Sequence, residues 1–399
     1  MTDASDGPAA AEGPEGGLLR DITVLDVSQI YNGPYATFLM AMAGARVIKV
    51  EPPSGEPLRK RAQLGGAALP FAMLNANKKG VVLDLKAPDG KADFLRLAAE
   101  ADVLVENFTP GVMERLELGP AELRAHNPRL VYARGSGYGQ SGRYRDYPAM
   151  DLTIQAMGGI MSVTGYPDKP PVKAGPAVSD FLAGIHLYGG IVTALYDRER
   201  TGRGRTVEVS MLDSVYASLS SNLGLLKDGT RRDALRTGNR HGGLAEAPYN
   251  VYRSANGHVA IICVGEEQWQ RLLAIMERPD LAEDARFASL KDRVAHIDLV
   301  DEAVEAFTSR HTSGALFELL GSRRITCAPV RTLHEVMNDP HMHETGMLTW
   351  FDHPDLGRIV LCRSPISYEG EDRMPPVASP RLGEHTAEIL GDRTRKVAP

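Results

Sequence analysis

From residue 22 onward, short apolar runs alternate with segments in which apolar residues recur every three or four positions. The short runs are rich in Val, Ile and Leu, are typical of buried strands, and lie at 22–28, 45–51, 80–85, 102–107 and 130–136. Helical periodicity fills the intervals, as in PYATFLMAMAG at 34–44 and GKADFLRLAAEA at 90–101. Strands separated by such helices imply right-handed crossovers. We therefore predict an α/β fold with a doubly wound parallel sheet covered by helices on both faces.

The pattern changes after a long apolar helical stretch at 179–202 and an alternating strand at 206–212. Residues 226–243 are charged and rich in glycine, which indicates a linker or exposed loop. Beyond them, YNVYRSANGHVAIICVG predicts a hairpin around Asn256 and Gly257. We predict a disordered tail at 1–18, a large domain at 19–225, a small α+β domain with linkers at 226–325, and a return to the large domain at 326–399.

Composition narrows the classes of partner. A chain of 399 residues with 43% hydrophobic content favours two soluble domains. The net charge of -6 predicts no broad attraction to nucleic acid or anionic membrane, so local groups must hold any anionic ligand. Three widely spaced cysteines indicate reduced thiols, residues 1–17 lack the features of a signal peptide, and no apolar run suggests a membrane span. We predict a cytoplasmic protein without nucleic-acid or membrane partners.

Two segments resemble cofactor motifs but do not meet the requirements of a cofactor site. The first strand-turn-helix, with Glu51 ending the next strand, occupies the place of a dinucleotide fingerprint but lacks its glycines, so we expect no NAD(P). The glycines of GYGQSG at 137–142 precede the polar segment RYRDYPAM, which favours a flexible turn over a phosphate loop. HMH at 341–343 has no third ligand nearby, so we expect a surface loop and no metal.

Two basic segments have two open interpretations. Lys78 and Lys79 come directly before one strand, and Arg59, Lys60 and Arg61 lie in the loop after another. Loops at the carboxyl side of neighbouring strands can grip phosphates. Solvated surface charge explains the same residues equally well.

Asp151 lies between a proline-containing loop and an apolar helical run in YPAMDLTIQAMGG, residues 147–159. Aspartate is favoured at a helix N-cap, and such a position stabilises the carboxylate form. A nucleophilic carboxylate needs that form. The residues alone leave open whether Asp151 only caps its helix or also does chemistry.

Several segments together resemble the class III coenzyme A-transferases, a family that includes formyl-CoA transferase, the carnitine CoA-transferases and the α-methylacyl-CoA racemases. The resemblance runs from about residue 19 to 390 through GARVIKVE, NANKKGVVLDL, DVLVENFTPGVMERLELGP, NPRLVYARGSGYGQSG, DLTIQAMGG, RERTGRGRTVEVSMLD and CAPVRTLHEVMNDPHM.

The resemblance implies a Rossmann-like large domain formed by both chain ends, an inserted small domain, and a homodimer of two interlocked rings. It implies CoA chemistry without metal or NAD, in which Asp151 attacks an acyl-CoA and passes through an anhydride and an aspartyl-CoA thioester. Gln29 and Tyr138 would contact the reacting groups, and Gly242 and Gly243, with Gly158 and Gly159, would offer N–H groups to oxyanions. The implied CoA-binding residues are Arg59, Lys78, Lys79, Asn107, Phe108 and Arg115.

Two departures bear on the reaction. The loop GNRHGGLAEAPY has fewer glycines than formyl-CoA transferase, and its Arg240 and His241 suggest pairing with the far carboxylate of a dicarboxylic acid. The racemases have histidine where this chain has Met150, which disfavours two-base proton exchange. We predict a CoA-transferase acting between carboxylic acids; the alternatives are a racemase and a CoA-binding protein without catalysis.

Overall fold

The computed structural model describes residues 16–61, 68–227 and 236–391, which form two compact units. The first unit comprises residues up to 154, residues 177–215 and residues from 339 onward; the second comprises 155–176 and 216–338. The sequence predicted the small domain at 226–325, and the second unit extends beyond both limits. Most of the predicted N-terminal tail, and residues 228–235 of the predicted linker, lie outside the described residues.

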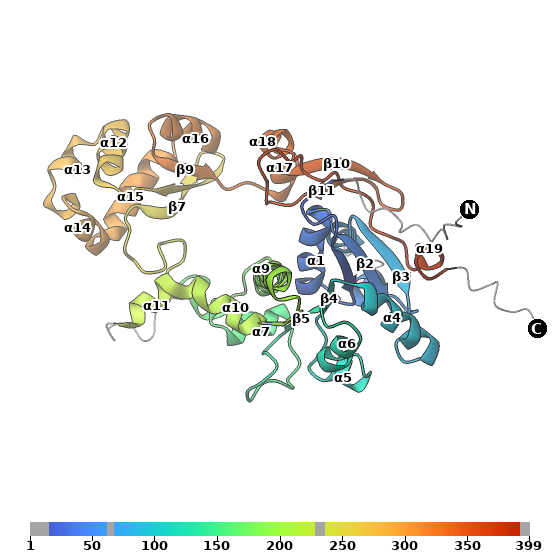
Figure 1. Cartoon of the computed structure of the whole chain (residues 1–399). Coiled ribbons are helices and arrows are strands. Elements are labelled where there is room, and N and C mark those ends of the chain that lie inside the picture. The colour runs from blue at the N-terminus through green and yellow to red at the C-terminus, as the bar shows by residue number, and fades with distance from the viewer. Residues whose placement is uncertain (1–15, 62–67, 228–235, 392–399) are drawn as a thin grey trace, which may run out of the picture. The chain divides into compact units, whose positions relative to one another are not determined.

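A parallel six-stranded sheet organises the first unit (Figure 1). The strand order is β3-β2-β1-β4-β5-β6, and every neighbouring pair is parallel, so the predicted α/β fold is confirmed. The strands are β1 (Thr23–Asp26), β2 (Arg46–Glu51), β3 (Lys78–Val82), β4 (Val103–Glu106), β5 (Val131–Ser136) and β6 (Thr206–Ser210).

The helices that begin in this unit cover the sheet. They are α1 (Asn32–Met42), α2 (Pro57–Arg61), α3 (Ala68–Leu74), α4 (Pro88–Glu100), α5 (Val112–Arg115), α6 (Pro120–His126), α7 (Asp151–Met157), α9 (Val178–Thr201), α10 (Met211–Tyr216), α18 (Pro340–Glu344) and α19 (Thr386–Leu390). The antiparallel pair β10 (Leu348–His353) and β11 (Gly357–Cys362) completes the unit.

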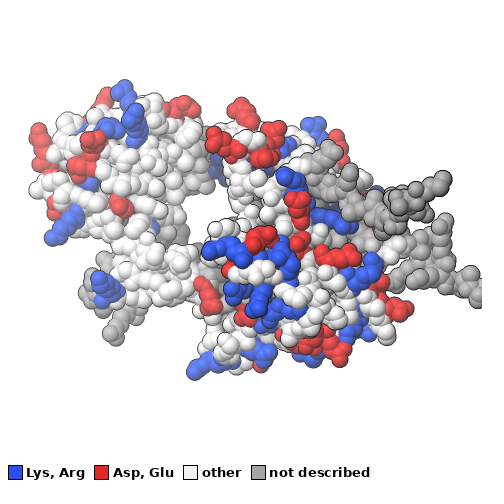
Figure 2. Space-filling model, in the orientation of Figure 1, with Lys and Arg blue, Asp and Glu red and all other residues white. Residues whose placement is uncertain are grey.

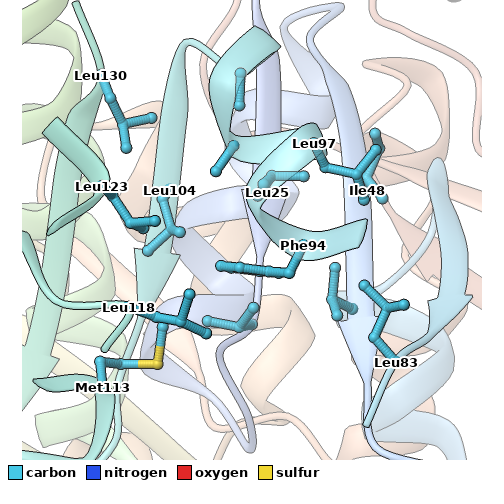
Figure 3. Close-up of a cluster of buried hydrophobic side chains, with 14 of the residues drawn as sticks. Leu25, Ile48, Leu83, Phe94, Leu97, Leu104, Met113, Leu118, Leu123 and Leu130 are labelled. Atoms are coloured by element: carbon cyan, nitrogen blue, oxygen red, sulfur yellow. The ribbon is translucent and has the colours of Figure 1, made fainter. Parts of the chain in front are cut away.

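Alternate residues of the strands feed two separate cores, because successive side chains point to opposite faces of a sheet. Leu25 of β1 lies in a cluster with Phe94 and Leu97 of α4 (Figure 3). Its neighbour Val24 lies in another cluster, formed with α1 and α9. Helices therefore cover both faces, as the sequence pattern predicted.

The carboxyl edge of the sheet carries the loops that matter for function. Because the strands are parallel, the loops after β1, β2, β4 and β5 all leave from this edge. The loop after β5 is long and ends at Asp151. Its start and end approach closely, since a Cβ atom on Gly137 would lie 2.1 Å from the Cβ of Ala149, so a larger residue at 137 would force them apart.

Helix α9 is long and apolar enough to span a membrane by length and composition. Its residues Leu187, Ile191 and Leu195 are nevertheless buried in the core beside β4 and β5. We therefore interpret α9 as a core helix of the first unit.

The second unit has its own core beside the antiparallel sheet β7-β8-β9. The predicted hairpin at Asn256 and Gly257 is confirmed, since these residues connect β7 to β8. Trp269 is fully buried in this core. The elements are α8 (Ile160–Val163), α11 (Ser220–Lys227), β7 (Tyr249–Ser254), β8 (Gly257–Ile262), α12 (Glu266–Met276), α13 (Pro279–Glu283), α14 (Leu290–Ala295), α15 (Ile297–Thr308), α16 (Ser313–Ser322), β9 (Thr326–Pro329) and α17 (Leu333–Met337), with 3-10 turns at Ala217–Leu219 and Ala285–Phe287.

Charged side chains of both signs are mixed over the face seen in Figure 2. The weakly acidic net charge is therefore not concentrated into one acidic field on this face. Anionic ligands would depend on local groups here, in line with the composition.

Candidate active site

Asp151 is the first residue of α7, and its carboxylate lies at the start of a different helix. Its Oδ1 accepts hydrogen bonds from the backbone N–H groups of Ser179, at 2.9 Å, and Asp180, at 3.4 Å, in the first turn of α9. The sequence suggested that Asp151 caps its own helix, whereas these bonds cap α9. The chemical consequence is similar, because N–H groups at any helix N-terminus favour a negative charge.

Asp180 is a second carboxyl group beside Asp151, and the sequence interpretation missed it. It is 7% exposed, and its carboxylate accepts a hydrogen bond from the backbone N–H of Asn32. Burial, followed by the charge of Asp151, raises the pKa of Asp180 to about 7. An acid in the first turn of a long helix looks ordinary in sequence, so only the fold reveals this neighbour.

The turn after β1 is held by Asn107, which the resemblance assigned to the CoA cleft. The Asn107 side chain accepts from the Gln29 N–H and donates to the Gln29 carbonyl, both at 2.8 Å. It also donates to Asn32 Oδ1 at 2.7 Å. Hydrogen bonds thus connect Gln29 through Asn107, Asn32 and Asp180 to Asp151, so the structure brings three predicted site residues into one polar chain.

Lys78 is not available for a phosphate, which corrects the suggestion of a basic loop. It lies within β3, and its side chain is fully buried. Its Nζ donates to Asp26 at 2.9 Å, to Thr37 at 2.8 Å and to Asn75 at 3.0 Å. Its positive charge therefore balances a buried carboxylate in the core.

Arg59 and Lys79 are also paired within the protein. Arg59 forms two hydrogen bonds with Glu51, at 2.7 and 2.8 Å, and its guanidinium lies 3.9 Å from the centre of the Phe71 ring. Glu51, at the position of a ribose-binding acid, is thereby occupied. Lys79 forms an exposed ion pair with Glu388 at 3.1 Å, which a competing anion could displace more easily.

A cavity of about 340 Å³ lies at the carboxyl edge of the sheet. Gln29 and Phe108, both predicted site residues, contribute to its wall. The rest of the wall mixes apolar side chains with polar ones: Lys60 and Lys86 add positive charge, and Glu51, Glu56 and Asp84 add negative charge. A cleft at the carboxyl edge of a parallel sheet is a common position for a small-molecule site.

Arg115 does not line this cavity, although its neighbours Val112 and Leu116 do, and it lies near a basic residue that sequence reasoning did not identify. A Cβ atom on Gly111 would lie 3.1 Å from a guanidinium nitrogen of Arg115 and 3.9 Å from one of Arg145. Two guanidinium groups over one glycine form a place where phosphate oxygens could be bound. The signal was weak in sequence, because Arg145 belongs to the loop after β5 and is 30 residues away.

Tyr138 belongs to a row of rings in the loop that leads to Asp151. Its ring centre lies 5.8 Å from that of Tyr144, which lies 5.7 Å from that of Tyr147. Ring contacts of this kind order a loop that otherwise has no regular secondary structure.

Gly242 and Gly243 belong to the second unit, where their loop is held by internal contacts. Arg240 pairs with Asp298 at 2.6 Å and with Asp301 at 2.7 Å. His241 accepts the Gly243 N–H through Nδ1 at 3.2 Å. The guanidinium of Arg240 is thus already balanced by two carboxylates, which corrects the suggestion that it pairs with a substrate carboxylate.

The HMH segment forms part of α18 and not a loop. Among residues 16–61, 68–227 and 236–391, no group of three or more His, Cys, Asp or Glu side chains could hold a metal ion.

Comparison with known proteins gives a consistent picture. The model of CoA-transferase family III matches residues 19–386. Acetyl-CoA:oxalate CoA-transferase of Acetobacter aceti is 36% identical over 96% of this chain and 96% of its own length. Succinyl-CoA:mesaconate CoA-transferase of Haloarcula hispanica is also 36% identical, over 94% of this chain and 96% of its own length. The crystal structure of a CAIB/BAIF family protein from Brucella suis has a TM-score of 0.82 and 31% identity, and it covers 94% of this chain and 99% of its own.

Proposed function

This chain belongs to CoA-transferase family III, and from that premise we propose that it transfers CoA from an acyl-CoA to a dicarboxylic acid, with Asp151 as nucleophile. The family resemblance seen in the sequence is thereby confirmed. The observation that carries the proposal is the Asp151 carboxylate at the N-terminus of α9, because the N–H groups of Ser179 and Asp180 hold it in one orientation for attack.

The proposed reaction begins when a carboxylate oxygen of Asp151 attacks the thioester carbonyl. The C–S bond breaks, its electron pair leaves on the CoA sulfur, and a mixed anhydride remains. The thiolate then attacks the Asp151 carbonyl of this anhydride, which frees the donor acid and forms an aspartyl-CoA thioester.

The acceptor completes the cycle by the same steps in reverse. Its carboxylate displaces CoA to form a second anhydride, and the thiolate attacks the acceptor carbonyl to give the new acyl-CoA and free Asp151. A thiolate with a parent pKa of about 8.5 is a good leaving group, which makes each step reasonable.

We propose a dicarboxylic acceptor because relatives are named for oxalate and mesaconate. The internal pairing of Arg240 removes it as the contact for the second carboxylate.

We propose that the nucleotide part of CoA occupies the cavity lined by Gln29 and Phe108. Lys79, Lys60 and the pair Arg115 and Arg145 are the proposed contacts for phosphate. Lys78 and Arg59 would support the site from within the protein, since their charges are already paired.

Filling this cavity should weaken CoA binding. Val112→Trp adds a large ring to the wall, and we expect the Kd for CoA to rise by roughly tenfold or more because the ligand and the indole compete for the same space. Isothermal titration calorimetry measures the effect. Val377→Trp, at a position that is 59% exposed, is the matched control. Equal affinities for the two variants would place CoA elsewhere.

We also propose the homodimer of interlocked rings that the family resemblance implies. Ile185, Val192 and Tyr196 expose apolar surface along one side of α9, and apolar faces of this kind favour a protein partner. The three cysteines are free thiols, which supports our placement of the enzyme in the cytoplasm.

Charge on this side of α9 should disrupt the dimer. We expect Val192→Glu combined with Ile185→Glu to shift the mass in multi-angle light scattering from two chains towards one, because burying unpaired carboxylates is costly. Val264→Glu, at an exposed position of the second unit, is the control. An unchanged dimer in the double variant would exclude this side of α9 from the interface.

A donor panel tests the proposed function directly. Succinyl-, acetyl-, formyl- and mesaconyl-CoA are each incubated with the protein and a set of acids, and new acyl-CoA is measured by mass spectrometry. Transfer to a dicarboxylic acid, with a hydroxamate at Asp151 when hydroxylamine is present, supports the mechanism. Deuterium incorporation at the acyl α-carbon without CoA exchange would indicate a racemase instead.

A further inference from the structure

Asp180 is a buried carboxyl group for which the proposed reaction has no role. Its backbone N–H donates to Asp151 Oδ1, and its own carboxylate accepts from the Asn32 N–H at the start of α1. Helices α1 and α9 pack very closely here, since a Cβ atom on Gly184 would lie 2.7 Å from the Asn32 carbonyl oxygen. The Asp180 carboxyl group therefore lies largely buried where α1 packs against α9.

The groups around Asp180 decide its charge. From α7 it faces Asp151, which is an anion in the proposed mechanism. From α1 it faces the Asn32 N–H, and the nearby Tyr35 is neutral because burial raises the pKa of its phenol. On α9 its neighbours are Ser179, whose side chain is uncharged, and Phe181, which packs against Tyr35. Burial and Asp151 both favour the protonated form of Asp180, and only the one N–H opposes them.

We propose that Asp151 and Asp180 form a carboxyl pair that carries one proton, with Asp180 as the member that holds it. This inference rests on the proposed function, and Asp180 acts in it as a positioning residue through Asp151. When only one of two neighbouring carboxyl groups is ionised, the repulsion between two anions is avoided.

The pair compensates for the change in charge during the reaction. When Asp151 attacks the thioester, its negative charge leaves with the CoA sulfur, and Asp180 no longer faces an anion. Asp180 then holds its proton less tightly. When the anionic acceptor carboxylate enters, or when Asp151 is freed, Asp180 takes up a proton again. An Asp180 that stayed ionised would repel the acceptor.

Stability against pH tests the pair without any measurement of activity. The pKa of Asp180 is about 7 in the folded protein and about 3.9 in the unfolded chain. Protonated Asp180 therefore contributes fully to the free energy of unfolding below about pH 3.9, and this contribution is lost as the pH rises to about 7. The measured quantity is the folded-to-unfolded ratio of wild type divided by the same ratio for Asp180→Asn. We expect it to fall by about tenfold per pH unit from pH 5 to 7 and to level off above pH 7.

The nucleophile provides the second arm of this test. The same stability comparison is made between Asp151→Asn and the double variant that also carries Asp180→Asn. The difference between these two proteins should level off at a lower pH, because the Asp151 anion that raises the pKa of Asp180 is absent from both. Urea unfolding of the four proteins measures this, and asparagine retains the shape of each side chain. Two outcomes contradict the proposed pair. In one, the stability difference between wild type and Asp180→Asn is the same at every pH. In the other, the pH at which the difference levels off is the same with and without Asp151→Asn.

Kinetics provide a separate readout of the same pair. In wild type we expect the KM for the acceptor acid to rise above pH 7 more steeply than kcat changes, and in Asp180→Asn we expect this pH dependence of KM to disappear. A pH dependence that survives in Asp180→Asn contradicts the inference. If wild type moves no CoA at any pH, the proposed function fails, while the unfolding experiments still decide whether the pair exists.

Discussion

Asp151→Asn and Asp151→Ala are expected to lower kcat for CoA transfer by roughly 10³-fold or more, since the proposed covalent intermediate cannot form without the Asp151 carboxylate. The asparagine variant keeps an oxygen that can accept the Ser179 N–H, so the start of α9 should stay in place. Initial rates with the best donor of the panel, together with loss of the hydroxamate at residue 151, measure the effect.

The control for Asp151 is another aspartate that accepts a backbone N–H at a helix start. Asp339 lies in the same unit, and its Oδ1 accepts from Met342 N–H at 2.9 Å at the start of α18. Asp339→Asn should retain transfer within a few-fold. If Asp151→Asn keeps wild-type kcat, then Asp151 only caps α9 and the covalent mechanism is excluded.

Lys78→Met is expected to lower the free energy of unfolding by about 3 to 5 kcal/mol, because it leaves the buried carboxylate of Asp26 without its closest cation. Burial alone would raise the pKa of Asp26, but the ammonium groups of Lys78 and Lys49 outweigh burial and hold this pKa below its ordinary value. Asp26 therefore stays ionised and needs the partner. Urea unfolding at pH 7 measures the loss.

Lys79→Met is a control one residue away. Its ion pair with Glu388 is about 40% exposed on each side, so we expect a loss below about 1 kcal/mol. The two variants should also differ in ligand binding: Lys79→Met should weaken CoA binding if Lys79 contacts phosphate. Similar stabilities for the two variants would show that the Lys78 pair is not important for the fold.

The part of the fold that depends on local pattern was predictable. Strands such as Thr23–Asp26 and Arg46–Glu51 are short apolar runs between helical segments, and this alternation is sufficient to predict a parallel sheet with two covered faces. The hairpin at Asn256 and Gly257 was also predictable from local sequence, because an Asn-Gly pair between two strand-like runs favours a tight turn.

The role of each charged residue was not predictable from position. Lys78, Arg59 and Arg240 looked like equal candidates for binding an anion, and each proved to be paired inside the protein. Their partners lie 52, 8 and 61 residues away in the chain. No local pattern carries the identity of a partner at such separations.

The sequence by itself determined the alternation of strands and helices, the family, and Asp151 as the residue to examine, because periodicity and motifs are properties of neighbouring positions. Only the folded chain shows that Asp151 accepts N–H groups of α9, that Lys78 is already paired with Asp26, and that Asp180 lies beside Asp151. The physical reason is that burial and charge pairing depend on distance in space. The packing of α1 against α9 brings together groups that the chain keeps far apart.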